Sequence, residues 1–596
     1  MLYVDARGGD DASDGLTPAR AWRTLAKVNA AALRPGDTVL FRRGQSWRGQ
    51  LVPRSGDETG CITYGAYGDG AKPLLLGSVP RNSPADWQQE AGEIWSTARA
   101  VYSEIGGAED LSRADWRVHD EGGAQVAVAR QGAVRELRCA ASGTRGNHIQ
   151  LYVTGLPIQA GRDYRFTFRA RCSRPFGAPA IRLMRSQKPW TSYGSPRVAA
   201  PAIGAEWRDL AMVFRASRTA DDGRITLFLG GVLPAGAILS FEPGRLAEVR
   251  CNQALPLDVD VGSIIFDHGA ATGVKKWTPE DLRQPGDYWY DGRNWRVLLR
   301  SVGNPAERHR SIELALRRHI INEGGRHHVT YEGLALRYGA AHGIGGGNTH
   351  HITVRDCDLS YIGGGHQFTR PGGRPVRYGN AIEFWDSAHD NLVEGCRIWE
   401  VYDAALTNQG NSPGNVQANI TYRHNVIWNC EYSFEYWNRD ATSRTENIRF
   451  EHNTCVDAGR GWAHGQRPDP NGRHLMFYHN SAQTSGFVIR HNIFASATES
   501  CLRLEPPDWS KGLVTERNCW WQPEGALLLW LRKPYAPEAF PAWRKATGQG
   551  SGSIVAAPRF VDAGGGDFRL RPDSRCRDLA SDGGPVGARS GARGAR

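Results

Sequence analysis

The sequence predicts an all-β protein: a right-handed parallel β-helix (a solenoid of short stacked strands) with an inserted antiparallel β-sandwich of jelly-roll type. Two observations carry this prediction, a strand unit that recurs from residue 327 onward and a different alternating pattern before it. A content of 71 Gly in 596 residues fits many strands joined by tight turns. We therefore divide the chain into an N-terminal cap with the first coils (1–84), the inserted sandwich (85–248) and the main β-helix with its C-terminal cap (249–596).

The recurring unit consists of alternating apolar and polar residues that end in Cys or Asn. It occupies residues 351–357, 391–396, 420–425, 448–453, 487–492 and 513–518. This alternation is typical of a half-buried strand, and the spacing fits one coil of three short strands. Because coils stack about 4.8 Å apart, like residues stack on each other, and the Asn column predicts a hydrogen-bonded ladder. We expect buried thiols at Cys357, Cys396, Cys455 and Cys519.

The ends and the insertion have their own patterns. Residues 18–34 predict an amphipathic helix that caps the first coil, as a solenoid requires. The insertion contains alternating segments separated by turn residues, which is typical of a sandwich. These segments are residues 148–153, 164–170, 208–214 and 225–229. Trp116, Trp190 and Tyr193 could stack on a sugar or could equally be core aromatics.

Several of these segments resemble known families. The terminal segments resemble the pectate-lyase-like β-helix proteins at residues 3–5, 15–18, 22–25, 35–37, 62–68, 558–562, 567–570 and 587–588. Residues 164–170, followed by 207–210, resemble a carbohydrate-binding-module jelly roll. The combination resembles glycoside hydrolase families 120 and 141. The resemblance implies a carbohydrate-active protein but does not select a reaction, because this fold carries lyases, hydrolases, esterases and epimerases.

One strand face, between residues 342 and 466, carries unusual polar residues. If Ile344, Ile382, Ala405, Phe434 and Ala463 point inward, their neighbours point outward. That reading places Glu383 and Glu435 in one surface column, two coils apart, with Asp403 on the coil between them. It also places Trp385, Asn408 and Trp437 in a second outward column. Carboxylates beside outward tryptophans are typical of a sugar site, where aromatic faces cover the C–H surface and acids attack the glycosidic bond.

We expect Glu383, Asp403 and Glu435 to supply the catalytic acid and the base or nucleophile. Two coils span roughly 9.6 Å, near the upper limit for an inverting glycosidase, whereas a one-coil pair approaches the roughly 5 Å of a retaining one. The sequence does not assign which carboxyl is the acid and which is the base or nucleophile. An alternative is that these acids form structural ion pairs with nearby arginines.

Other side chains on this face and in its loops are candidates for substrate binding. They are His342, His366, Arg370, Asn380, Trp385, Asn408, Trp437, Arg439 and His464. The Gly-rich loop 363–378 and the loop 459–474 are expected to wall the site, since long excursions between coils often build binding surfaces.

Composition and charge limit the classes of molecule that this protein is expected to bind. The net charge of +11 favours an acidic polysaccharide, although an arginine-rich coding bias explains it equally well. No Lys/Arg block indicates nucleic acid, and no apolar run reaches the roughly 18 residues of a membrane span. No CxxC or His/Cys spacing indicates zinc, so we expect neither metal nor cofactor. A polysaccharide substrate implies a secreted or periplasmic protein, whose leader we expect to have been cut from this chain.

Two other functions stay open. A polysaccharide lyase would cleave a uronate-containing glycan by β-elimination, with Arg, Lys or Tyr as the base. Arg370, Arg374, Arg377, Arg439 and Tyr432 could serve, but no calcium-type Asp cluster is evident and lysine is absent from the expected cleft. The second alternative is a non-catalytic glycan-binding protein that has the same groove without a working acid pair.

Overall fold

The computed structural model describes residues 1–98, 100–252 and 256–589. Strands account for 49% of the structure and helices for 7%, which confirms the all-β class. The chain forms two compact units, the first from Met1–Trp95, Val259–Trp289 and Leu299–Arg596, and the second from Ser96–Asp258 and Tyr290–Leu298. Residues 253–255 and 590–596 of the predicted third segment, and residue 99 of the second, lie outside the described residues.

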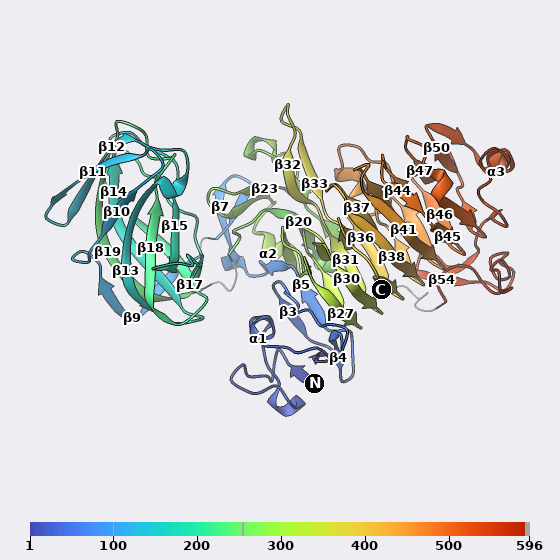
Figure 1. The fold of residues 1–596 in the computed structure, drawn as a ribbon, viewed down its shortest axis with the longest axis horizontal. Coiled ribbons are helices and arrows are strands. Elements are labelled where there is room, and N and C mark those ends of the chain that lie inside the picture. The colour runs from blue at the N-terminus through green and yellow to red at the C-terminus, as the bar shows by residue number, and fades with distance from the viewer. Residues whose placement is uncertain (99, 253–255, 590–596) are drawn as a thin grey trace. The chain divides into compact units, whose positions relative to one another are not determined.

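In the first unit the chain passes repeatedly through three largely parallel sheets, which we name A, B and C (Figure 1). Each strand pairs with the equivalent strand of the next coil. Sheet A contains β1 (Leu2–Val4), β2 (Thr38–Arg42), β4 (Ile62–Tyr67), β27 (His327–Glu332), β30 (His350–Arg355), β35 (Leu392–Glu394), β38 (Val416–Arg423), β41 (Arg444–Glu451), β44 (Gln483–Ser485), β45 (Phe487–Arg490) and β48 (Leu513–Glu516).

Sheets B and C complete each coil. Sheet B contains β3 (Ser46–Arg48), β5 (Leu74–Leu76), β28 (Ala335–Arg337), β31 (Asp358–Ile362), β36 (Arg397–Val401), β39 (Val426–Trp428), β42 (Thr454–Ala458), β46 (Ile493–Ala497), β49 (Cys519–Trp521) and β52 (Ile554–Val555). Sheet C contains β26 (Ile321–Asn322), β29 (Ile344–Gly347), β34 (Ile382–Trp385), β37 (Ala404–Gly410), β40 (Tyr432–Asn438), β43 (Arg473–Phe477), β47 (Ser500–Leu504), β50 (Leu528–Trp530) and β51 (Lys533–Tyr535).

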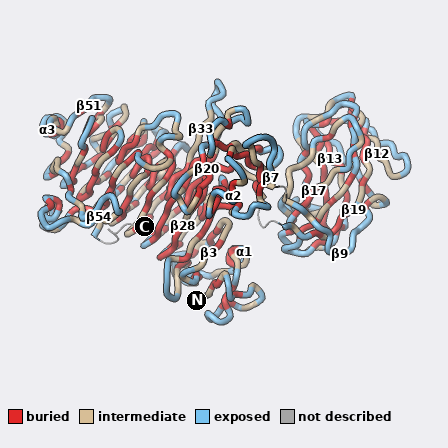
Figure 2. The backbone as a smooth tube through the Cα atoms, turned by 180° about the vertical axis from the view of Figure 1, so that it is seen from behind, coloured by how far each residue is buried: buried red, intermediate tan, exposed pale blue. Residues whose placement is uncertain are grey.

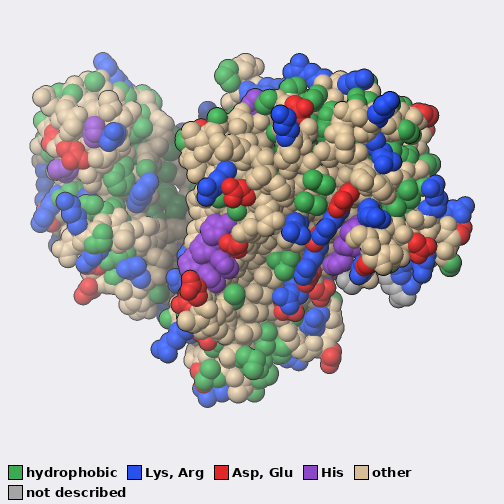
Figure 3. Space-filling model, turned by 45° about the vertical axis from the view of Figure 1, so that its right-hand side comes forward, with side chains coloured by type: hydrophobic (Ala, Val, Ile, Leu, Met, Phe, Trp, Pro, Cys, Tyr) green, Lys and Arg blue, Asp and Glu red, His purple; other side chains and the backbone are tan. Residues whose placement is uncertain are grey.

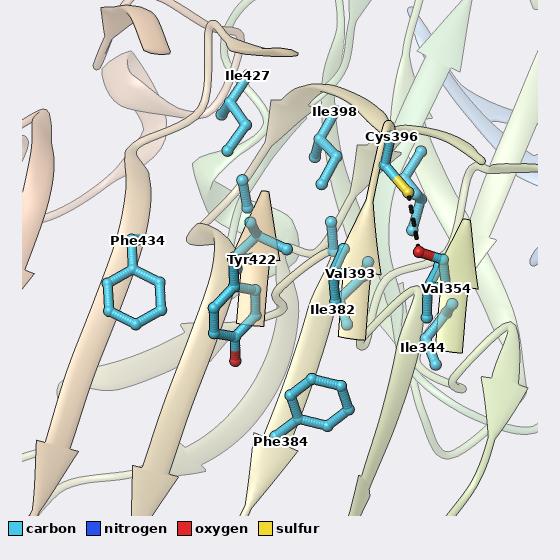
Figure 4. Close-up of a cluster of buried hydrophobic side chains, with 14 of the residues drawn as sticks. Ile344, Val354, Ile382, Phe384, Val393, Cys396, Ile398, Tyr422, Ile427 and Phe434 are labelled. Atoms are coloured by element: carbon cyan, nitrogen blue, oxygen red, sulfur yellow. Dashed lines mark hydrogen bonds between the residues drawn. The ribbon is translucent and has the colours of Figure 1, made fainter. Parts of the chain in front are cut away.

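The core of the first unit consists of buried residues from all three sheets. Figure 2 shows that buried residues run along the stacked coils. In Figure 4, Ile382 of sheet C, Val393 of sheet A and Ile398 of sheet B lie in one cluster of buried hydrophobic side chains. The Cys396 thiol contacts the carbonyl oxygen of Val354 at 3.7 Å. Cys357, Cys396, Cys455 and Cys519 are buried free thiols, as predicted.

Two ladders run along the stack of coils. Buried side chains of Asn425, Asn453, Asn492 and Asn518 bond to one another at 3.0–3.1 Å, which is the predicted asparagine ladder. On the outer face of sheet A, acidic and basic residues alternate from coil to coil, visible as a red and blue stripe in Figure 3. The stripe consists of Glu332, Arg355, Glu394, Arg423, Glu451, Arg490 and Glu516.

The predicted capping helix over residues 18–34 is wrong in length. The structure has a 3-10 turn at Pro18–Arg20, and α1 spans only Leu25–Ala30. Trp22 forms a β-bridge with Val4, which draws the backbone between the two helical segments into an extended conformation. In the part of the chain that the structure describes, the other α-helices are α2 (Pro305–Arg308) and α3 (Phe540–Thr547). Within the described residues, none of the helices is long and apolar enough to cross a membrane.

The second unit has two antiparallel sheets that enclose their own hydrophobic core. One contains β10 (Arg117–Asp120), β13 (Ile149–Ile158), β15 (Ala180–Arg185) and β18 (Ala220–Phe228). The other contains β9 (Tyr102–Asp110), β11 (Gln125–Gln131), β12 (Val134–Ala141), β14 (Asp163–Cys172), β16 (Gly194–Pro196), β17 (Arg208–Ala216) and β19 (Ile238–Cys251). Tyr290–Leu298 also belongs here, although 249–596 was predicted as one segment, and the Tyr290 hydroxyl donates to the Leu257 carbonyl at 2.6 Å.

Candidate functional site

Sheet C aligns two of the expected carboxylates. Strand register pairs Glu383 of β34 with Thr407 of β37, and Thr407 with Glu435 of β40. The two glutamates therefore share one column, two coils apart, as the alternation predicted. Their chain neighbours Ile382 and Phe434 lie in the core, so the glutamates leave the strands on the opposite side.

Both glutamates are buried, which corrects the prediction that they stand on an open surface. Glu383 is 8% exposed and Glu435 is 5% exposed. The Trp437 indole donates its Nε1–H to Glu435 at 3.1 Å. Alternation along a strand indicates on which side a side chain lies, but it does not show what covers that side.

His342 holds Glu383 in place. Its Nδ1 accepts the backbone N–H of Asn380 at 3.0 Å, so the neutral ring carries its proton on Nε2. Nε2 lies 3.0 Å from a carboxyl oxygen of Glu383 and donates to it. Burial lowers the pKa of His342 well below its usual value, so the donor is an uncharged imidazole. Two residues predicted to bind substrate, His342 and Asn380, thus position a carboxyl.

Asp403 lies immediately before β37, on the coil between the two glutamates. Its carboxylate contacts Arg467 Nη1 at 3.2 Å. Arg467 also approaches Glu431, which precedes β40 and is 3.6 Å from Arg467 Nε and 3.0 Å from His464 Nδ1. We call Glu383, Asp403, Glu431 and Glu435 the carboxyl cluster; Arg467 is the cation that contacts it at Asp403 and Glu431.

Burial dominates the acidities of Glu383, Asp403 and Glu435. Burial, with a smaller contribution from the charge of Asp403, raises the pKa of Glu383 to about 8 and the pKa of Glu435 well above its usual value. Burial and the nearby Glu431 also raise the pKa of Asp403, against the opposing effect of Arg467. The donors at Glu383 and Glu435 are neutral, whereas a guanidinium contacts Asp403, so Asp403 ionises most readily of the three.

The second predicted column, of Trp385, Asn408 and Trp437, is correct for the two tryptophans and wrong for Asn408. The register places Gln409, not Asn408, between Trp385 and Trp437. Asn408 is fully buried and hydrogen-bonds to the Tyr422 hydroxyl inside the coil. Trp385 and Trp437 meet edge to face with ring centroids 5.3 Å apart, and the Arg439 guanidinium lies 4.2 Å from the Trp437 ring.

The loop 363–378 is a hairpin of β32 (Gly365–Thr369) and β33 (Pro375–Tyr378). Arg370 lies in its exposed turn, where its N–H bonds to the carbonyl of Arg374. The His366 backbone N–H donates to Asp260 at 2.7 Å, and the His366 ring packs edge-on against Trp277.

A lysine, Lys275, lies beside this hairpin, although the sequence predicted none in the expected cleft. Its ammonium pairs with Asp260 and donates to the Val261 carbonyl at 2.6 Å, and burial lowers the pKa of Lys275 to about 8. The Arg377 side chain binds the Gly364 carbonyl at 2.7 Å and stacks on Tyr402 at 4.6 Å. Nothing near residues 260–275 in the sequence signalled these contacts, because they join segments far apart in the chain.

The prediction that the loop 459–474 lines the site is partly correct. The Ala463 segment was expected to be a strand of sheet C, but it forms a loop with a 3-10 turn at His464–Gln466, and the strand of that coil is β43 (Arg473–Phe477). His474 lies inside the coil, where Nδ1 contacts the Ser433 hydroxyl at 3.0 Å. Arg467, His464 and Asn471 of this loop reach the carboxyl cluster, and the backbone N–H of Asn471 donates to the Glu431 carboxylate at 2.8 Å.

The aromatic residues of the second unit divide into core and surface. Trp116 and Tyr193 are buried in its core, whereas Trp190 is 50% exposed. The Arg224 guanidinium lies 3.7 Å from the Tyr152 ring and 5.3 Å from the Trp190 ring. Among the described residues, groups of three metal-ligand side chains occur on sheet A and not at the carboxyl cluster.

No family model matches this chain, and no curated protein matches it. Among solved structures, the chain is similar to one described as a glycoside hydrolase, at 10% identity and TM-score 0.40, covering 93% of this chain and 96% of that one. It is also similar to the GH136 lacto-N-biosidase from Eubacterium ramulus, at 11% identity and TM-score 0.31, covering 93% and 67%. A structure titled "CBM4 structure and function" matches at 19% identity and TM-score 0.20, covering 22% and 86%. These neighbours are carbohydrate-active proteins, but similarities this low carry no argument about reaction or substrate. The predicted resemblances to pectate-lyase-like proteins and to families 120 and 141 stay predictions.

Proposed function

We propose that this protein is a right-handed parallel β-helix glycoside hydrolase that cleaves a polysaccharide or oligosaccharide at the carboxyl cluster of sheet C. The observation that carries the proposal is the contrast between carboxyls on three successive coils. Glu383 and Glu435 are buried beside neutral donors, whereas Asp403 contacts a guanidinium. Environments that keep one carboxyl protonated and let another ionise are what acid and base catalysis of glycoside hydrolysis requires.

In this proposal Glu383 is the general acid and Asp403 is the base or nucleophile. The protonated Glu383 donates its proton to the glycosidic oxygen as the bond from that oxygen to the anomeric carbon breaks. Asp403 either removes a proton from the attacking water or bonds to the anomeric carbon, and water then releases the sugar. Either way, one water molecule is consumed for each bond cleaved. Glu435, whose pKa burial also raises, is the competing candidate for the acid.

The separation of the carboxyls bears on stereochemistry. Asp403 lies on the coil next to that of Glu383, but the register partner of Glu383 is Thr407, four residues further along the chain, so the Asp403 and Glu383 carboxyls are offset along the strand as well as by one coil. If Glu383 and Glu435 formed the working pair, two coils, or roughly 9.6 Å, would favour inversion. Proton NMR of the first product anomer shows whether the reaction retains or inverts the configuration of the anomeric carbon.

The surroundings of the cluster suit a sugar. Trp385 and Trp437 offer aromatic surface next to the carboxyls, and Arg439 and His464 offer donors at its margin. Asp403 is the most accessible of the three carboxyls, with a side chain 20% exposed, so the scissile bond would enter at Asp403.

The test uses a panel of polysaccharides and of aryl glycosides, with product masses determined for the wild type and for D403N, E383Q and E435Q. We expect D403N to lose activity on every substrate. We expect E383Q to lose roughly 10²- to 10⁴-fold on natural glycans but to keep much more activity on aryl glycosides whose phenol leaves without protonation. Glu446→Gln, an exposed glutamate of sheet A, is the matched control. Full activity in all three cluster variants would show that the site is elsewhere.

The same panel tests the alternatives. A β-elimination product is unsaturated, absorbs in the near ultraviolet and is one water lighter than a hydrolytic product. The observation that favours a lyase is the buried Lys275, whose lowered pKa suits a base, although Asp260 and the Val261 carbonyl occupy its ammonium. Glycan binding without new chain ends on any substrate would indicate a binding protein.

For the second unit we propose glycan binding at the surface formed by Tyr152 and Trp190. The exposed Trp190 ring offers a stacking face for a sugar, while the buried Arg224 guanidinium packs against both rings and donates to Thr226 and Gln150. A polysaccharide substrate would place the whole protein in the periplasm or outside the cell.

A further inference from the structure

Three coils of sheet A carry pairs of adjacent metal-ligand residues at the same position. The pairs are His327-His328, His350-His351 and His389-Asp390. The strand register aligns His327 with His350, and a β-bridge aligns His350 with His389. Side chains that are far apart in the sequence therefore form one compact patch, visible as a group of purple side chains in Figure 3.

The imidazoles stack in two columns that follow the coil spacing. In the first column, the rings of His327, His350 and His389 have centroids 4.7 and 4.8 Å apart and are parallel within 3°. In the second column, the rings of His328 and His351 are 4.4 Å apart and within 6° of parallel. The columns stand side by side, so each coil contributes one ligand to each column.

The backbone turns the two members of each pair toward each other. His328, His351 and Asp390 have φ of 53°, 54° and 54°, in the left-handed region that non-glycine residues rarely adopt. Within the pairs, Nδ1 atoms are 3.2 Å apart for His327 and His328 and 3.0 Å apart for His350 and His351. His389 Nδ1 lies 2.7 Å from a carboxylate oxygen of Asp390. Lone-pair-bearing atoms thus converge between the columns.

We propose that this patch, the His–Asp site, binds a divalent transition-metal ion such as Zn²⁺. Its ligand atoms form two groups of three, and His351 belongs to both. The first group also contains His328 and His350, and the second contains His389 and Asp390. Within each group all ligand atoms lie within 4.8 Å of one another. Zinc bonds of about 2.0–2.1 Å place tetrahedral ligand atoms about 3.3 Å apart, so small side-chain rotations close the groups around an ion.

The chemistry of the donors indicates the class of metal. Imidazole nitrogens with a single carboxylate suit Zn²⁺, Co²⁺, Ni²⁺ or Cu²⁺, whereas Ca²⁺ and Mg²⁺ require oxygen ligands. A neutral imidazole carries its proton on one ring nitrogen and leaves the other nitrogen free to bind a metal. His351 is exposed, and the other members are half-buried, which leaves a path for the ion.

The site lies on sheet A, whereas the carboxyl cluster lies on sheet C, so the proposal is independent of the proposed hydrolase activity. It also reverses the expectation of no metal, which rested on spacings within one segment of chain. The pairs gain their metal-binding arrangement only when three coils stack.

Isothermal titration of Zn²⁺ into the full chain, after chelator treatment and dialysis, tests the proposal. We expect saturable binding that H351N weakens by at least about tenfold, because His351 belongs to both groups. Asparagine suits this position, since Asn419 and Asn447 adopt φ of 55° and 53° in later coils. H350Q is a second variant that removes a ligand without changing a left-handed residue. His479→Gln, an exposed histidine outside the patch, is the control.

Cobalt gives an independent readout, because Co²⁺ bound by imidazoles has visible absorption bands that depend on its ligands. We expect these bands in the wild type and in H479Q, and their loss in H351N and H350Q. Circular dichroism checks that the variants are folded. Absence of saturable Zn²⁺ binding in the wild type, or equal affinity in folded H350Q or H351N, would show that the imidazole columns are only a stacking device.

Discussion

Replacing Glu383 by glutamine should stabilise the protein, and the gain should grow with pH. Glu383 is 8% exposed, and burial raises its pKa from the usual 4.5 to about 8. Folding at neutral or alkaline pH therefore requires either a proton from solution or a buried carboxylate. Glutamine has the same shape, can accept the Nε2–H of His342 and carries no charge at any pH.

The magnitude follows from the interval between the two pKa values. The folded state binds more protons than the unfolded state between about pH 4.5 and 8, so the wild type loses stability as pH rises through this window. At about 1.4 kcal/mol per pH unit, the upper bound for the full window is about 5 kcal/mol. Water and side chains reorganise around a buried carboxylate once it ionises, so we expect about half of that, roughly 2–3 kcal/mol.

The assay is urea unfolding of the wild type and E383Q at several pH values from 4.5 to 8.5, followed by far-ultraviolet circular dichroism. The free energy of unfolding of E383Q relative to the wild type should rise by roughly 2–3 kcal/mol across that range. Glu446→Gln, whose side chain is solvent-exposed, should show no such rise. Infrared spectra should contain a protonated-carboxyl band at pH 7 that E383Q weakens. A constant difference across the pH range would refute the claim that Glu383 is a neutral acid.

Two further substitutions test the fold and the second unit. Asn453→Ala removes a fully buried side chain that bonds to the ladder asparagines of both neighbouring coils. We expect the free energy of unfolding in urea to fall by about 3 kcal/mol. The exposed Asn411→Ala is the control and should lower it by less than about 0.5 kcal/mol. A similar loss in both would contradict a stabilising ladder. Trp190→Ala should weaken polysaccharide binding in affinity gels about fivefold, since an aromatic contact contributes about 1 kcal/mol. Trp207→Ala, on the other sheet, is the control and should leave binding unchanged. Unchanged binding in Trp190→Ala would exclude this surface.

The stacking of coils explains how much of the site was predictable. In a solenoid, a residue's neighbours in space are the equivalent residues of adjacent coils, so the alternation along one strand already determines a column. The shared column of Glu383 and Glu435, the paired tryptophans Trp385 and Trp437, and the asparagine ladder all follow from this repetition.

Prediction failed where the repetition is broken. The register places Leu406, not Ala405, in the inward column with Ile382 and Phe434, so Asn408, two residues further along β37, lies inside the coil instead of outside. The expected strand at Ala463 fails for a similar reason, because a long loop delays the strand of that coil to Arg473–Phe477.

By itself, the sequence determined the all-β class, the strands of the repeat and the side of sheet C on which the acids stand, because each of these depends on short-range periodicity. Only the tertiary structure decided that the acids are buried, that Arg467 contacts Asp403, that Lys275 lies beside the hairpin, and that three His-containing pairs stack on sheet A. Burial and pairing depend on loops of irregular length that fold back over the coils, and no local pattern encodes where such loops end.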